Sequence, residues 1–118
     1  MVKNMKIHEM KEQIHNEIVK FLKDNGFISI YVSIDVDITS YGMCYVSVYI
    51  NALKVKFKSM YLKIENSVGE IVLNDNELKI TIALAYEVND DIAKIINDVV
   101  NQIKTIVKII LMIDIMSL

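Results

Sequence analysis

Residues 27–39 read FISIYVSIDVDIT, and no other part of the chain alternates apolar and polar side chains so cleanly. Successive side chains of a β-strand point to opposite faces of a sheet, so this pattern predicts a long strand. The apolar face would hold Ile28, Ile30, Val32, Ile34, Val36 and Ile38, and the other face Phe27, Ser29, Tyr31, Ser33, Asp35 and Asp37. We expect this strand to open an antiparallel sheet.

Two more strands are predicted after the turn at residues 39–42 (TSYG). The second covers residues 43–51 and buries Cys44, Val46, Val48 and Ile50. The third begins near Leu53, with Leu53, Val55 and Phe57 inward and the intervening lysines outward. Its alternation slips by one residue at Ser59, which predicts a β-bulge or bend there.

The remaining elements complete an α+β domain. Short and long strands are predicted over residues 70–73 and 77–87, each preceded by a polar turn. Apolar residues at helical spacing predict one helix over residues 5–24 and another that begins after Asn89. We therefore expect one domain over residues 1–118, with about five antiparallel strands in the order α-β-β-β-β-β-α.

The composition is that of a folded globule. Of 118 residues, 53% are hydrophobic and 24% are charged, which excludes intrinsic disorder. The net charge of −2 gives no general attraction to nucleic acid or to an anionic membrane. One cysteine, no signal-peptide core and no long apolar run predict a cytoplasmic protein without a membrane segment. Isoleucine is the commonest residue, all 13 basic residues are lysine, and proline and tryptophan are absent. This pattern indicates an AT-rich genome, such as many low-GC bacteria, archaea and their viruses have.

Few residues offer catalytic or metal chemistry. Gly26, Gly42 and Gly69 are all assigned to turns, so no glycine-rich phosphate loop is predicted. Two histidines, His8 and His15, lie roughly 10 Å apart along the predicted helix, too far for one ion. With a single cysteine, the usual zinc motifs are excluded, and we expect no metal and no cofactor.

Two candidates for chemistry have simpler structural explanations. Asp35 and Asp37 share a strand face roughly 7 Å apart, which could serve a metal-dependent hydrolase, but a solvated polar face explains them as well. Cys44 lies on the apolar face of its strand, where core packing is the better explanation than nucleophilic catalysis. The sequence therefore predicts a protein without enzymatic activity.

One surface of the predicted sheet combines aromatic rings with positive charges. This candidate partner-binding face consists of Tyr31, Tyr45, Tyr49, Lys54, Lys56 and Lys58. Tyrosine is enriched at protein interfaces, so the face could bind a protein. It could instead bind single-stranded nucleic acid, with bases stacked on rings and lysines along the phosphates, or be a plain solvated face.

The C-terminal run is almost wholly apolar from residue 109 to 118. Its side chains form a candidate oligomer interface: Ile109, Leu111, Met112, Ile113, Ile115 and Met116. Surplus apolar surface is most simply hidden between two subunits, so a homodimer is expected. A terminal element buried within one subunit is the alternative. The run could extend the helix or form a final strand, and the absence of glycine or proline favours the helix.

The element order is similar to that of type III secretion chaperones, judged on residues 17–26 leading into the strand at Phe27 and residues 77–87 leading into the helix at Asn89. That resemblance implies a dimer that binds other proteins. Those chaperones usually carry an extra middle helix, which is not predicted here, so the family is not assigned. We expect a non-enzymatic interaction protein with a protein partner, a chaperone or adaptor or a small viral protein that acts on a host complex.

Overall fold

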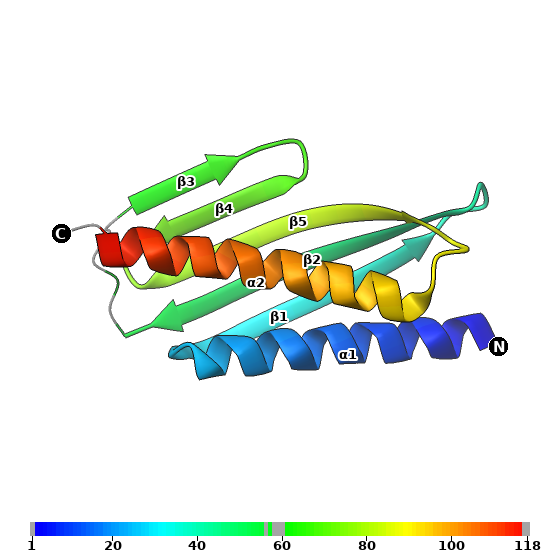
Figure 1. The fold of residues 1–118 in the computed structure, drawn as a ribbon, viewed down its shortest axis with the longest axis horizontal. Coiled ribbons are helices and arrows are strands. Elements are labelled where there is room, and N and C mark those ends of the chain that lie inside the picture. Colours follow the sequence, from blue (N-terminus) through cyan, green and yellow to red (C-terminus); the bar gives the residue numbers. More distant parts are fainter. Residues whose placement is uncertain (1, 56, 58–60, 117–118) are drawn as a thin grey trace.

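The computed structural model describes residues 2–55, 57 and 61–116 of the chain (Figure 1). The chain begins and ends with a helix, and the five strands lie between these helices in the sequence, as predicted. The elements are α1 (Val2–Asp24), β1 (Phe27–Ile38), β2 (Met43–Lys54), β3 (Tyr61–Glu65), β4 (Gly69–Asn74), β5 (Glu77–Glu87) and α2 (Ile92–Met116). The α+β class and the element order are thereby confirmed.

The strands form one antiparallel sheet in the order β1-β2-β5-β4-β3. Consecutive strands pair everywhere except at the centre, where β2 lies beside β5. The β1–β2 turn is closed by Thr39, whose backbone amide donates to the Met43 carbonyl at 2.8 Å. Gly42 in that turn has a φ of 88°, a conformation that costs glycine little.

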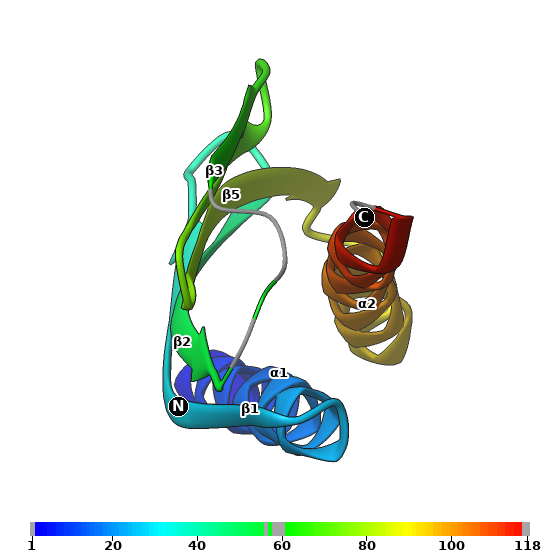
Figure 2. The same cartoon turned by 90° about the vertical axis from the view of Figure 1, so that its left-hand side faces the viewer.

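Both helices pack on the same face of the sheet, as the view along the strands shows (Figure 2). α1 turns one apolar stripe inward, and Ile14, Ile18 and Leu22 on it are fully buried. α2 does the same with Val99, Ile103 and Val107. The core therefore lies between one helical layer and one face of the sheet, while neither of the helices described covers the opposite face.

The start of β1 differs from the predicted alternation. Phe27 is buried at 3% exposure whereas Ile28 is 52% exposed, the reverse of the expected facing. The pairing of β1 with β2 shifts register between Ile28 and Tyr31, and Ser29 has a φ of 50° there. The extra residue turns Phe27 inward, where its ring packs 5.9 Å from that of Phe57. From Tyr31 onward the predicted facing is correct.

The predicted third strand also begins in the wrong place. Leu53 and Lys54 belong to β2, because β5 extends far enough to pair Leu53 with Glu77. Val55, predicted to point inward, is 74% exposed, although Phe57 is buried as expected. The predicted slip at Ser59 lies outside the described residues.

The apolar C-terminal run continues the helix, since α2 extends to Met116. The alternative of a final strand is therefore wrong for residues 109–116, and residues 117 and 118 lie outside the described part. Among all the residues that the structure describes, no helix is long and apolar enough to cross a membrane.

Candidate functional site

The uncovered side of the sheet carries a broad surface that we call the open face. It is formed by those alternate residues of the adjacent strands β1, β2 and β5 that lie opposite the buried ones in the strand pleat. Figure 2 shows both helices on the other face of the sheet. Its members include Tyr31, Ser33, Asp35, Asp37, Tyr45, Ser47, Tyr49, Lys79, Thr81, Ala83 and Ala85. Most are exposed, and Tyr45 and Tyr49 are half-buried.

The register of the strands arranges the open face in rows that run across the sheet, each with one residue from β1, one from β2 and one from β5. The central row pairs Asp35 with Ser47 and Ser47 with Ala83. The row on one side contains Tyr49, between Ser33 and Thr81, and the row on the other side contains Tyr45, between Asp37 and Ala85. Small side chains thus form a lane between two tyrosine-bearing rows.

The tyrosines of the open face contact one another. The rings of Tyr31 and Tyr49 meet edge to face with centroids 6.0 Å apart. At the other end, the hydroxyls of Tyr41 and Tyr45 lie 3.3 Å apart. Hydrogen bonding to Tyr41, followed by the charge of that phenol, burial and Asp37, raises the pKa of Tyr45 above its ordinary value. The three predicted tyrosines therefore share one surface, and Tyr41 adds a fourth ring.

Strand alternation does not place Tyr41 on this surface, because Tyr41 lies in the predicted turn between two strands. Its spacing of four residues from Tyr45, across the glycine of a tight turn, is the signal that could have identified it.

Lys54, the one predicted lysine that the structure describes, does not join the tyrosines as expected. Lys54 ends β2 at a position two residues beyond buried Ala52, and its Nζ lies 5.5 Å from the centroid of the Phe57 ring. That contact places Lys54 toward the helical layer, so it does not share the surface of Tyr45 and Tyr49. Lys56 and Lys58 lie outside the described residues.

Lys79 is an open-face lysine that the sequence analysis does not name. It pairs with Asn51, which pairs with Tyr31 in turn, and its Nζ lies 3.7 Å from Glu77 Oε1. With Asp35 and Asp37 fully on the surface, carboxylates outnumber cations among the open-face residues. The parity of β5, which was predicted correctly, was sufficient to place Lys79.

The other residues considered for chemistry are dispersed. Cys44 is buried at 3% exposure, and burial, reinforced by the negative charge of Asp37, raises the pKa of its thiol. On α1, His8 Nε2 lies 3.8 Å from Glu12 Oε2, whereas the His15 ring lies 3.4 Å from the amide oxygen of Asn16. Within the described residues, no three histidine, cysteine or acidic side chains are grouped so that they could hold a metal ion.

No family model, curated protein or solved structure matches this chain.

The candidate oligomer interface divides into two sides on α2. Ile109 and Met112 are 48% and 60% exposed, and their spacing of three residues places them on the same side of the helix. Leu111 and Ile113 are half-buried against the rest of the molecule, and neighbouring Ile110 is in the core. The side chains of Ile115 and Met116 lie outside the described ones, although both residues are helical.

Proposed function

We propose that this chain is a non-enzymatic interaction domain that binds a protein partner through the open face. The observation that carries the proposal is the lane of small side chains between tyrosine-bearing rows, on a sheet face that no helix covers (Figure 2). Tyrosine offers a large contact area for the loss of few rotatable bonds, and it is enriched where proteins meet. Ser47 and Ala83 leave room for a partner segment to approach the sheet closely.

The charge of the open face favours a basic partner. Asp35 and Asp37 are exposed on β1, the edge strand of the open face, and the open-face lysine Lys79 already lies beside Glu77. Opposite charge across an interface steers encounter and suppresses wrong partners. A lysine- or arginine-rich surface of another protein therefore suits this face better than an acidic one.

Single-stranded nucleic acid remains the second candidate on the evidence of the Tyr31–Tyr49 ring pair, which could stack bases. Its support is weaker because Lys54 lies on the other side of the sheet and two carboxylates would repel a phosphate backbone. A hydrolase that uses Asp35 and Asp37 has less support still, since those two carboxylates have no third metal-binding group beside them among the described residues.

Affinity capture with matched variants tests the protein-binding proposal. We expect the wild-type chain to retain a partner from its native host that Ala83→Arg loses, because a long cation in the central row blocks the lane. Tyr61→Ala is the control, since Tyr61 is also an exposed tyrosine but lies on the far edge strand β3. The captured protein is then purified, and its affinity for all three chains is measured by calorimetry.

The proposal fails if Ala83→Arg binds that purified protein as tightly as the wild type does. Fluorescence anisotropy with labelled oligo(dT) and oligo(U) separates the alternative. Binding that falls steeply with salt and is abolished by Tyr31→Ala/Tyr49→Ala would assign nucleic acid as the partner instead.

A further inference from the structure

The outer edge of β3 has no strand beside it among the residues that the structure describes. β3 ends the strand order β1-β2-β5-β4-β3 and lies at the margin of the molecule (Figure 1). The other edge strand, β1, has α1 beside it, whereas β3 projects beyond both helices (Figure 2). A free edge presents backbone N–H and C=O groups that can pair with a strand of another chain.

The hydrogen bonding of the β3–β4 hairpin shows which residues face this edge. The Asn66 amide donates to the Gly69 carbonyl at 3.0 Å, so Asn66 directs its backbone amide toward β4. The direction of the backbone groups alternates from residue to residue along an antiparallel strand. Lys63 and Glu65 therefore direct their N–H and C=O groups outward, to the free edge.

The sequence at this edge is complementary to itself. It reads Lys63-Ile64-Glu65, that is, basic, apolar and acidic. A strand that pairs antiparallel with it needs a basic residue opposite Glu65, then an apolar residue opposite Ile64, then an acidic residue opposite Lys63. Residues 63–65 of a second copy occur in this same order, so a two-fold axis at Ile64 satisfies all three positions.

Ile64 supplies the apolar part of this contact. Its side chain lines a hollow together with Ile71 of β4 and Ile106 of α2, and it is still 37% exposed. In the two-fold arrangement, Ile64 lies opposite Ile64 of the second copy as a non-hydrogen-bonded pair, the type in which side chains come closest. Pairing therefore buries apolar surface that a single chain leaves in water.

Charge selects this register over its two neighbours. An axis at Lys63 would place two lysines opposite each other, and an axis at Glu65 would place two glutamates opposite each other. Like charges directly opposite destabilise paired strands. With the axis at Ile64, each Lys63 lies opposite a Glu65. Within one chain, Lys63 Nζ lies 3.4 Å from Glu65 Oε2, but this pair is exposed and can exchange for a pair between chains.

We propose that β3 pairs antiparallel with β3 of a second copy, centred on Ile64, and so joins two sheets edge to edge. The two-fold axis stands perpendicular to the joined sheet, which places both open faces on the same side. Two hydrogen-bonded residue pairs make a small contact, so the contact is weak and forms at high protein concentration. It is separate from the exposed side of α2 at Ile109 and Met112, and it does not depend on the partner proposed for the open face.

Disulfide trapping tests the register. The Cα atoms of a non-hydrogen-bonded pair lie about 4.5 Å apart, which a disulfide spans, so Ile64→Cys should cross-link two copies in oxidised glutathione. Val68→Cys is the matched control, because Val68 is 41% exposed but lies in the turn, outside the paired residues. We expect Ile64→Cys to cross-link several-fold faster. Cys44 does not compete, because it is buried at 3% exposure.

Charge exchange tests the pairs between Lys63 and Glu65. In the Ile64→Cys background, Lys63→Glu and Glu65→Lys each place like charges opposite each other. Each should slow cross-linking about five-fold, which corresponds to about 1 kcal/mol. An equimolar mixture of the two variants restores opposite charges in both pairs, so a mixed dimer should form as fast as the Ile64→Cys dimer. Isotope labelling of one variant lets mass spectrometry identify the mixed dimer.

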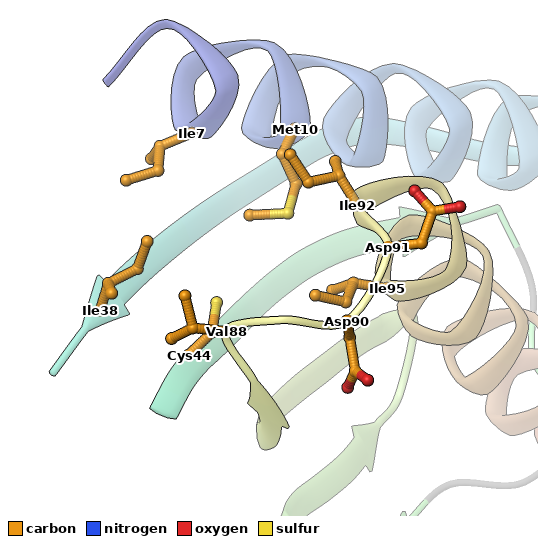
Figure 3. Close-up of a pocket in the computed structure, with 9 residues that line it drawn as sticks. All are labelled: Ile7, Met10, Ile38, Cys44, Val88, Asp90, Asp91, Ile92 and Ile95. Atoms are coloured by element: carbon orange, nitrogen blue, oxygen red, sulfur yellow. The ribbon is translucent and has the colours of Figure 1, made fainter. Parts of the chain in front are cut away.

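Methyl NMR tests the pairing in the unmodified chain. The Ile64 signal should shift as protein concentration rises, and Lys63→Glu should suppress the shift. Reference signals come from an apolar cavity of about 350 Å³, where α1, the turn end of β1 and β2, and the start of α2 meet (Figure 3). Ile38 and Ile95 line this cavity, which lies toward the opposite end of the molecule from β3, so their signals should not move (Figure 1).

Three results would overturn the proposal. The first is cross-linking of Ile64→Cys that is no faster than that of Val68→Cys. The second is a mixture of the charge variants that cross-links no faster than either variant alone. The third is an Ile64 signal that does not depend on the concentration of the unmodified chain.

Discussion

Gly69 stands where the backbones of β4 and β5 approach closely. It is the first residue of β4, opposite Ile82, and it also closes the predicted turn, because its carbonyl accepts the Asn66 amide at 3.0 Å. A Cβ atom added there would overlap the carbonyl oxygen of Thr81 and lie 2.8 Å from Ile82 Cα. The obstacle is backbone, which cannot move aside as the end of a flexible side chain can. Glycine is required at this position because the backbone of β5 leaves no room for a Cβ atom.

We therefore expect Gly69→Ala to lower the free energy of unfolding by about 2 kcal/mol, as overpacking typically does. Urea denaturation followed by circular dichroism measures the change. Ser67→Ala, an exposed change in the adjoining turn, is the control and should alter stability by less than about 0.5 kcal/mol. Equal stability of Gly69→Ala and wild type would show that β4 and β5 can separate at no cost.

At the scale of elements, a hydrogen bond joins α2 to the sheet. The Tyr86 hydroxyl on β5 donates to Asp98 Oδ2 on α2 at 2.5 Å. Burial, followed by this hydrogen bond and the charge of Asp98, raises the pKa of Tyr86 well above its ordinary value. The neutral phenol is thus favoured in the folded state, and the first turns of α2 gain a polar anchor next to their apolar contacts.

Tyr86→Phe should lower the free energy of unfolding by about 1 kcal/mol near neutral pH, because a charge-assisted hydrogen bond is lost. The contribution is complete below about pH 10 and is lost above it, since the unfolded chain ionises there first. Urea denaturation between about pH 9 and pH 11 should therefore show a steeper loss of stability for wild type than for Tyr86→Phe. Parallel pH profiles would contradict this assignment, and Tyr61→Phe on exposed β3 serves as the control.

Sequence patterns predicted the helices and strands better than the irregular backbone at the start of β1. Alternation located β5 with its exact bounds, and helical periodicity located α1 and α2, because each pattern reflects contact with one core. The bulge at Ser29 could not be predicted in the same way, since it depends on Phe27 finding Phe57.

The candidate site was partly predictable for the same reason. Tyr45 and Tyr49 share a face by strand parity, which the sequence contains. Lys54 was misplaced because the end of β2 is set by the length of β5, a partner distant in sequence. The apolar cavity was not predicted at all, since its wall combines residues from both helices, from the ends of β1 and β2, and from the loop between β5 and α2.

At the scale of the whole molecule, the structure has two layers, one sheet and one layer of helices. The Cα trace measures 51 × 26 × 18 Å, and the shortest dimension accommodates one sheet and one helical layer. One face of the sheet and one side of α2 are thus left to solvent in a single chain. Apolar surface that remains at Ile109 and Met112 is a natural contact for a second copy.

We expect the purified chain to be a homodimer and Ile109→Lys/Met112→Lys to be monomeric, because two charges at the centre of an apolar contact oppose its burial. Light scattering measures the mass directly. Val55→Lys, a cation introduced at another exposed apolar position, should leave the dimer intact. A wild-type chain that scatters as a monomer at high concentration would remove the dimer from the account.

The strand order has a consequence for how the chain reaches its fold. Three of the four strand pairs join neighbours in sequence, so their contacts form after short chain closures. The β2–β5 ladder is different, because the whole β3–β4 hairpin lies between its partners along the chain. Closing that loop costs entropy before the ladder returns any stabilisation. Pairing of β2 with β5 is therefore the slow step of folding, in which the β1–β2 hairpin joins the locally formed β3–β4–β5 unit.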